Sequence, residues 1–213
     1  IIDHLSFEVQ DGEFVSIIGA SGCGKSTIFR LVNKLLTPAS GVIRVDGESI
    51  ETKKNYCGYM PQQDLLFPWR TVRENLMLPM EIQGGYSKEQ MQKKADDALR
   101  SVGLADWGDK TPKELSGGMR QRAAFARTVL TGSDLLLLDE PFSAMDTHLR
   151  ERLRLELASV LSEYQGASVM VTHDRDEAYQ LCDTLLLLSR GQVIAAGKTK
   201  ELFQDPGSVE AAR

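Results

Sequence analysis

The sequence predicts an α/β fold: a mainly parallel sheet core with an antiparallel β part and an inserted helical subdomain. Short, almost entirely apolar runs at residues 14–18, 135–138, 169–171 and 185–188 are typical of buried strands. Segments with apolar residues at helical spacing separate several of these runs, and strands that alternate with helices form a parallel sheet. Residues 71–131 contain no convincing strand, so we expect the helical subdomain there. The 213 residues fit a single domain, 1–213.

Composition limits the classes of protein that need to be considered. The chain has 30 acidic and 25 basic residues, a net charge of −5, which does not suggest a protein that coats nucleic acid or an anionic membrane. No apolar run approaches the ~20 residues that span a bilayer. Three widely spaced cysteines, Cys23, Cys57 and Cys182, argue against a disulfide framework and for a reducing compartment. The chain opens without Met in strand-like sequence, so we expect it to be cut at both ends.

The first sixty residues predict three further strands and one helix. Leu5, Phe7 and Val9 alternate with polar residues, as in a half-buried strand, and a turn follows at residues 11–12. Helical spacing predicts a helix from Lys25 to Leu36, stopped by Pro38. Residues 41–45 and 58–60 are the other short strand candidates.

The rest of the chain predicts four more helices. Ser87 to Gln90 is a capping-box pattern. It opens a helix with an apolar face made of Met91, Ala95, Ala98, Leu99 and Val102 and ended by Gly103. Another helix is expected from about 116 to 130. A third has the stripe Leu149, Leu153, Leu157 and Leu161, and a fourth covers 174–181. The polar residues 204–213 are expected at the surface.

Residues 19–27, GASGCGKST, have the form of a phosphate-binding loop between a buried strand and a helix. Glycines let backbone N–H groups turn toward an anion, and the following helix directs its positive end to the same place. Lys25 adds a positive charge, and the Ser26 hydroxyl is suited to Mg²⁺. A plain Gly/Ser-rich helix cap is the alternative. The residues expected to contact the phosphates are Gly19, Ser21, Gly22, Cys23, Gly24, Lys25, Ser26 and Thr27.

Acidic residues and a histidine follow two strands of the predicted sheet. Asp139 and Glu140 come directly after residues 135–138, at the strand end where α/β sheets place their ligands. Asp139 is suited to hold Mg²⁺ and Glu140 to polarise a water that attacks a γ-phosphate. His173 ends the next strand at the same edge, where we expect it to contact the γ-phosphate. A charged loop and a structural histidine are the alternatives. A carboxylate that activates water argues against a kinase.

A second anion site is predicted in the stretch LSGGMRQR, residues 115–122. Ser116 would cap a helix, whose first backbone N–H groups, with those of Gly117 and Gly118, can bind an anion. We do not expect one bound nucleotide to require two such sites of the same chain. A head-to-tail pair of chains could use both, each phosphate loop being covered by the partner's Ser-Gly-Gly.

With these motifs in this order, the chain resembles the nucleotide-binding domain of an ABC transporter. The resemblance implies the P-loop NTPase fold with a RecA-like core. It makes 19–27 the Walker A motif, LLLLDEP the Walker B motif with the catalytic Glu140, and THD the segment with the catalytic switch histidine. FSAMD, 142–146, would be the D-loop, with Asp146 at the dimer interface and Met145 where Leu is commoner. YMPQQDLLFPW would be the Q-loop, in which Gln62 rather than Gln63 senses the nucleotide and helps hold the metal. The strand that usually carries the adenine-stacking aromatic would precede residue 1.

The resemblance also implies a mechanism. Two domains close on two ATP molecules with Mg²⁺, hydrolyse them and reopen, and the helical subdomain and Gln62 region pass the motion to integral membrane permease subunits. The aromatic stretch 67–69 is either locally packed or near the permease groove. A separate chain suits an importer at the cytoplasmic face of the inner membrane, indirectly served by an extracytoplasmic binding protein and with no nucleic acid partner. PWRTVRENL resembles nitrate, sulfonate, taurine and thiamine-precursor importers, whereas ELFQDPGSVEAAR resembles oxyanion importers. The alternatives are a soluble ABC-type ATPase of DNA repair or translation and a domain excised from an exporter.

Overall fold

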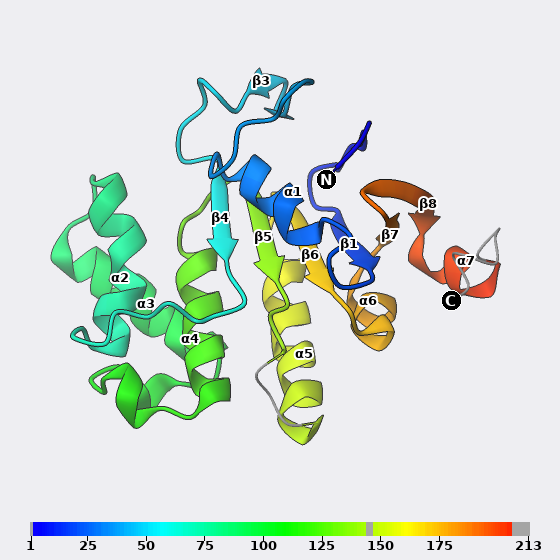
Figure 1. Cartoon of the computed structure of the whole chain (residues 1–213). Helices are drawn as coiled ribbons and strands as arrows, with labels where there is room; N and C mark the ends of the chain where they lie inside the picture. The colour runs from blue at the N-terminus through cyan, green and yellow to red at the C-terminus, as the bar shows by residue number, and fades with distance from the viewer. Residues whose placement is uncertain (1, 144–146, 206–213) are drawn as a thin grey trace.

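A six-stranded sheet forms the centre of the molecule (Figure 1). This computed structural model describes residues 2–143 and 147–205. The sheet order is β4-β5-β6-β1-β7-β8, and all neighbours are parallel except β7 and β8, which are antiparallel. The strands are β1 Phe14–Gly19, β4 Cys57–Met60, β5 Leu135–Asp139, β6 Ala167–Thr172, β7 Thr184–Ser189 and β8 Gln192–Lys198. The α/β fold with a mainly parallel sheet is thus confirmed.

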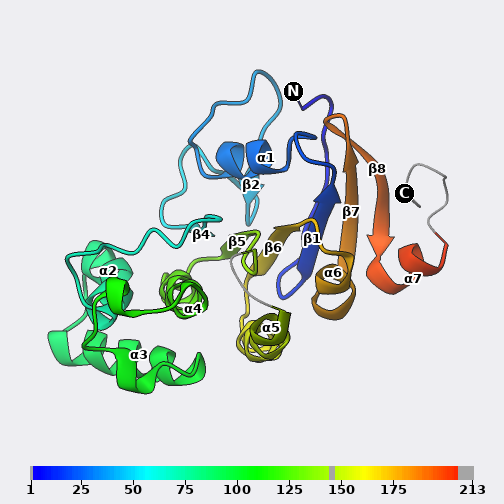
Figure 2. The ribbon, with the colours of Figure 1, turned by 60° about the horizontal axis from the view of Figure 1, so that its bottom comes forward.

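Helices cover both faces of the sheet (Figure 2). Helix α1 (Lys25–Val32) lies on one face, where Ile28 and Phe29 pack with Ile17, Leu137 and alternate residues of the neighbouring strands. Helices α5 (Thr147–Ser162) and α6 (Arg175–Leu181) lie on the other face. Because successive side chains of a strand point to opposite faces, one apolar strand supplies both cores. This explains why the central strands are apolar throughout.

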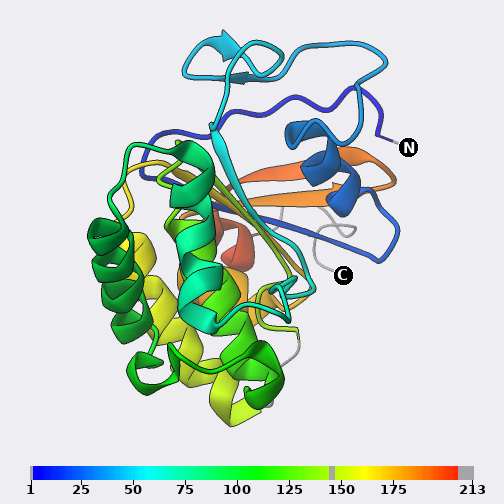
Figure 3. The ribbon, with the colours of Figure 1, turned by 90° about the vertical axis from the view of Figure 1, so that its left-hand side faces the viewer.

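The regular elements between β4 and β5 in the described structure are all helices, joined by loops (Figures 1 and 3). They are α2 Val72–Gln83, α3 Lys88–Ser101, η1 Ala105–Trp107, η2 Pro112–Glu114 and α4 Gly117–Val129. Leu76, Leu99 and Phe125 are completely or almost completely buried among them, in the same cluster as Met60 and Leu138 of the sheet. The helical group therefore shares one continuous core with the sheet.

The predicted helices of this group are confirmed, and one was missed. Both hydrogen bonds of the Ser87 capping box are present at the start of α3, and Ser116 caps α4 as expected. Helix α2 was not predicted, although Thr71 and Glu74 form a second capping box at its start. Pro79 inside the helix weakens the sequence signal, because proline removes one backbone donor.

Four other features of the structure differ from the sequence predictions. The predicted strand at residues 5–9 is wrong: Leu5 and Val9 pack against the core, but residues 5–9 belong to no strand of the described structure. Helix α1 ends at Val32, four residues before Leu36, at the cap residue Asn33. The strand predicted at 41–45 shrinks to β2 (Arg44–Val45), which pairs only with the two-residue β3 (Glu48–Ser49). Strand β8 and the short helix α7 (Thr199–Gln204) were not predicted.

Two further predictions concern α5 and membrane association. On α5, Leu157 is buried and Leu161 packs on the same core, whereas the side chains of Leu149 and Leu153 lie outside the described part of the structure. No helix among the described residues combines the length and the apolar character that a membrane crossing requires. Asp146 and Met145 also lie outside the described residues.

Candidate nucleotide site

The loop between β1 and α1 has the backbone geometry that an anion cradle needs. Gly22 and Gly24 have φ angles of 80° and 114°, which side chains with a Cβ rarely adopt. Gly24 is the cap residue of α1, so the free N–H groups of the first helical turn point toward the loop. At Gly19 an added Cβ would lie 2.3 Å from the carbonyl oxygen of Leu188, so only glycine fits there. Glycine spacing, strand and helix therefore occur together as the motif requires.

Lys25 directs its ammonium group into this loop. The side chain is buried, and its Nζ donates to the carbonyl oxygens of Gly19 at 2.6 Å and Ala20 at 3.1 Å. A phosphate oxygen carries charge and is a stronger acceptor than either carbonyl. The ammonium is therefore held where it can transfer to an outer phosphate. Cys23 is buried as well, and its sulfur lies close to Gly19.

Asp139 is a buried carboxylate at the end of β5. It is 7% exposed, and the Tyr59 hydroxyl donates to its Oδ2 at 3.3 Å. Burial raises the pKa of Asp139, and the negative charge of Glu140 raises it further, while Tyr59, Lys25 and Arg30 lower it. A cation beside this carboxylate would stabilise its charged form. A second oxygen donor suited to such a cation is the hydroxyl of Ser26, an exposed residue in the first turn of α1.

These donors fit Mg²⁺ bound together with a nucleotide. No cluster of three or more His, Cys, Asp or Glu side chains in residues 2–143 and 147–205 could hold a metal by itself. Mg²⁺ needs no such cage, because it commonly takes one or two protein oxygens and completes its shell with water and substrate phosphates. One carboxylate and one hydroxyl are therefore a suitable protein contribution.

Three side chains predicted to be catalytic meet at one point of the sheet edge. Gln62 Nε2 donates to Glu140 Oε2 at 2.9 Å, and His173 Nδ1 lies 3.3 Å from Glu140 Oε1. The meeting follows from the topology, since β5 and β6 are parallel neighbours and Asp139 pairs with Val171. Each Glu140 oxygen thus has a different polar partner. Gln62, and not its neighbour Gln63, makes the contact.

The backbone at Glu140 is unusual for a residue other than glycine. Its φ is 48°, in the left-handed region, and its N–H donates to the carbonyl of Val171 at 2.9 Å. Such a conformation is strained by about 1–3 kcal/mol and persists only where the surrounding structure imposes it. Here it turns the chain sharply after β5 and directs the carboxylate to Gln62 and His173.

An ion cluster supports the segment that carries His173. Arg154 of α5, itself buried, lies 3.0 Å from Asp174 Oδ2 and 3.5 Å from Glu177 Oε1. Asp174 caps α6 by accepting from the backbone N–H groups of residues 176 and 177, and Thr172 donates to Glu177. The ion pair of Arg154 with Asp174 and the contact of Tyr59 with Asp139 were not predicted, because they join residues 20 and 80 positions apart and leave no local sequence pattern.

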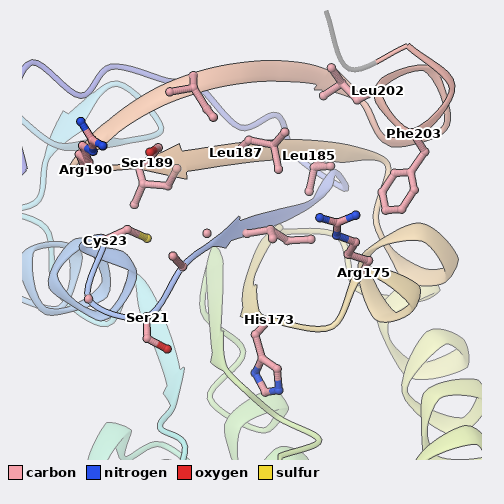
Figure 4. A pocket seen from close by; sticks show the side chains of 16 residues that line it. Ser21, Cys23, His173, Arg175, Leu185, Leu187, Ser189, Arg190, Leu202 and Phe203 are labelled. Carbon is pink, nitrogen blue, oxygen red and sulfur yellow. The ribbon is translucent and has the colours of Figure 1, made fainter. Parts of the chain in front are cut away.

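A cavity of about 870 Å³ opens beside the loop (Figure 4). Ser21 and Cys23 line it from the loop, His173 and Arg175 from the segment after β6, and apolar residues of β7, β8 and α7 complete it. Neither Asp139 nor Glu140 lines this cavity. It therefore adjoins the cluster of catalytic candidates rather than containing it.

The second predicted anion site does not join the first within one chain. Ser116 is exposed at the start of α4, where its hydroxyl accepts from the N–H of Met119 at 3.3 Å. Figures 1 and 2 show α4 with the helical group, apart from the loop that leads into α1. The structure thus brings together the phosphate loop, Asp139, Glu140, Gln62 and His173, but leaves Ser116, Gly117 and Gly118 at a separate position.

Comparison with known proteins identifies the class. A model of the ABC transporter family matches residues 2–143. The chain therefore belongs to the ABC transporter family, and it is an ATP-binding cassette of the kind that hydrolyses ATP.

Three curated relatives are similar to the chain in sequence over most or all of its length. The ABC transporter ATP-binding protein YtlC of Bacillus subtilis is 41% identical over 99% of the chain and 79% of its own length. The bicarbonate transport protein CmpC of Synechococcus elongatus is 42% identical over 88% of the chain and 28% of its own length. The spermidine/putrescine import protein PotA of Nitratidesulfovibrio vulgaris is 35% identical over 100% of the chain and 58% of its own length. The chain thus spans only part of these relatives, little more than half of PotA and less of CmpC.

A solved structure agrees with the sequence relatives. The ATP-binding cassette MJ0796, in a dimeric post-hydrolysis state bound to ADP and Pi, superposes with a TM-score of 0.82 at 30% identity. The match covers 93% of this chain and 90% of that one.

Proposed function

We propose that this chain is the ATP-hydrolysing subunit that powers import of a solute across a membrane through a separate permease. The observation that supports hydrolysis is the meeting of Gln62, Glu140 and His173 beside the phosphate loop. A loop alone would only bind a nucleotide. A carboxylate held between an amide and an imidazole can also accept a proton from an attacking water.

Each residue of the site has its own role in ATP hydrolysis. Backbone N–H groups of residues 19–27 and the Lys25 ammonium bind the β- and γ-phosphates. Ser26, Asp139 and Gln62 would hold Mg²⁺, which neutralises phosphate charge when bound. Glu140 orients the water and takes its proton, and His173 contacts the γ-phosphate through the ring edge that does not face Glu140. Asp139, Glu140 and His173 are held at the ends of strands, so their charges and dipoles need little reorientation in the chemical step itself.

The active form is a head-to-tail homodimer. Ser116, Gly117 and Gly118 lie apart from the loop of their own chain, which suits them to cover the nucleotide bound by a partner. The dimeric state of MJ0796 supports this assembly. Asp146 would lie at the same interface.

Import is favoured over the alternatives by the relatives. PotA is named as an import protein and CmpC as a transport protein, and their similarity supports a cassette that works with integral membrane permease subunits at the cytoplasmic face. An extracytoplasmic binding protein would deliver the solute. As the solute we propose a small anion of the nitrate, sulfonate or taurine type, which is supported by the PWRTVRENL stretch and by the similarity to CmpC, a bicarbonate transport protein. A repair or translation ATPase, or an exporter domain, is the second choice.

Substitution of Glu140 by Gln tests the hydrolysis mechanism. Glutamine keeps the shape but cannot accept the proton, so ATP should still bind while turnover falls at least about 100-fold. Size-exclusion chromatography with Mg-ATP should then show a trapped dimer. Glu163→Gln, an exposed carboxylate elsewhere, is the matched control and should behave as the wild type. Normal turnover in Glu140→Gln would exclude Glu140 as the water activator.

Purification from the native membrane tests the transport role. The full natural polypeptide should copurify with a hydrophobic permease. Recovery with ribosomes or DNA ends instead would reject import in favour of the soluble ATPase.

A further inference from the structure

The segment that carries Gln62 is held by side chains of helix α4. Residues 61–67 have no helix or strand of their own, so other parts of the molecule must fix their position. We propose that Gln121 and Arg127 of α4 are positioning residues, which bind the backbone of residues 62–65 and thereby set the contact between Gln62 and Glu140. The inference rests on the proposed function, because it assigns to α4 the control of Gln62 during hydrolysis.

Three side chains of α4 reach this segment. Gln121 Nε2 donates to the carbonyl oxygen of Gln62 at 2.9 Å. Arg127 donates through Nη1 to the carbonyl of Leu65 at 2.9 Å and through Nη2 to the carbonyl of Asp64 at 3.0 Å. Arg120 Nε donates to the Asp64 carboxylate at 3.0 Å. Backbone carbonyls at both ends of the 62–65 segment are therefore bound to one helix.

The energetics indicate a specific role for Arg127. Its guanidinium is half-buried, and burial lowers its pKa, while the negative charge of Asp64 in the bound segment raises it in part. The hydrogen bonds to Asp64 and Leu65 go to neutral main-chain oxygens. The planar fork fits two adjacent carbonyls at once, which a lysine ammonium cannot reproduce with the same geometry. A side chain that only had to stabilise α4 would not need this arrangement.

Gln121 adds a second constraint from the helix interior. It is 2% exposed, so its amide cannot exchange the Gln62 carbonyl for water without opening the core. Its own Oε1 has no hydrogen-bond partner among the described residues. A buried unpaired oxygen of this kind costs about 1–3 kcal/mol of stability. The side chain keeps this position nonetheless, and its Nε2 group binds the segment.

The arrangement makes α4 a rigid link between two places. Ser116 begins the helix, and Arg127 lies eleven residues later, about 16 Å along the axis at 1.5 Å per residue. In the proposed dimer the Ser116 end faces the partner's nucleotide, while Gln121 and Arg127 hold Gln62 at the chain's own Glu140. Any rotation of α4 on dimer closure therefore changes the position of Gln62 relative to Glu140.

A double-mutant cycle in ATP hydrolysis tests the proposal. The variants are Arg127→Met, Gln121→Leu and Gln62→Ala, alone and in combination, in the full natural polypeptide. Arg127→Met should lower kcat by about 10- to 100-fold, as expected of a misplacement near 1 Å, with ATP affinity within about twofold of the wild type. In the Gln62→Ala background the same change should lower kcat by less than about threefold, because both act through Gln62. Gln121→Leu should likewise lower kcat in the wild-type background and much less in the Gln62→Ala background. This variant tests the proposal if Arg127→Met does not fold.

The control is Arg73→Met, which removes a partly buried arginine that pairs with Asp96 and Asp109 in the same helical group. It should lower thermal stability without a selective loss of kcat. Equal losses for Arg127→Met in the wild-type and Gln62→Ala backgrounds, or a loss of kcat in Arg73→Met as large as in Arg127→Met, would overturn the inference. A wild-type protein with no ATPase activity would overturn the proposed function and this inference together, whereas active wild type with unchanged Arg127→Met and Gln121→Leu would overturn the inference alone.

Discussion

Replacement of Arg154 by methionine removes the positive centre of the ion cluster between α5 and α6. The side chain of Arg154 is 9% exposed and that of Glu177 5%, so the change leaves a buried carboxylate without its nearest cation. Methionine keeps most of the aliphatic volume, and the loss is therefore one of charge and hydrogen bonding rather than of packing.

The expected destabilisation is about 3 kcal/mol at pH 7.5. Loss of one partner of a buried ion pair costs about 3–5 kcal/mol. We take the lower end, because Arg150 remains 3.4 Å from Asp174 and continues to neutralise it. For a chain of this size, 1 kcal/mol moves the melting temperature by about 2–4 °C, so Tm should fall by about 6–12 °C.

The deficit should depend on pH, and its sign follows from Glu177. Burial raises the pKa of Glu177, while the charge of Arg154 lowers it, so the variant should have a still higher pKa at this position. A carboxyl with a raised folded-state pKa favours folding below its unfolded pKa and loses that contribution as pH rises through the folded value. The deficit of Arg154→Met should therefore be small near pH 4.5 and grow toward pH 8, by about 1.4 kcal/mol for each unit of further rise.

Denaturant titrations of Arg154→Met and wild type at pH 5, 6.5 and 8 measure this difference directly. Arg100→Met is the matched control, because Arg100 pairs with Asp97 at the surface, where such pairs contribute at most about 1 kcal/mol. A deficit of the same size at all three pH values, or one no larger than that of Arg100→Met, would refute the reasoning about Glu177.

Two further predictions concern the phosphate loop and helix α2. Lys25→Ala should weaken binding of a fluorescent ATP analogue by at least about 10-fold, because it removes a charge-assisted contact to the phosphates, and should abolish ATPase activity; wild-type turnover would count against the cradle. Thr71→Val should lower the free energy of unfolding by about 1 kcal/mol, since the Thr71 hydroxyl caps α2 by accepting from the N–H of Glu74 at 3.2 Å. Thr71→Ser keeps the cap and should cost much less, and equal losses for both would show that the hydroxyl is unimportant.

The sequence was most informative where local chemistry and topology coincide. Asp139, Glu140 and His173 each follow an apolar strand, and parallel strands end at one edge, so their proximity could be predicted. The choice of Gln62 over Gln63 came from the family resemblance, and in the structure it is Gln62 that contacts Glu140. Capping residues such as Ser87 and Ser116 marked helix starts for the same local reason.

What the sequence did not predict depends on long-range contacts. Arg154 reaches Asp174 across 20 residues and Tyr59 reaches Asp139 across 80, and neither pair has a spacing that a pattern could detect. Strand β8 is half-exposed and pairs antiparallel at the edge of the sheet, so it lacks the apolar run of the central strands. Residues 5–9 alternate as a strand should, but pairing, and not alternation, decides whether a strand forms.

The left-handed backbone at Glu140 bears on how such a chain changes over generations. Glycine, and to a lesser degree asparagine, adopts this conformation at lower cost than glutamate does. A duplicated copy released from the need to turn over nucleotide should therefore drift readily to one of these residues and become harder to unfold. Glutamate therefore stands in this chain at a position where glycine would give the less strained main chain.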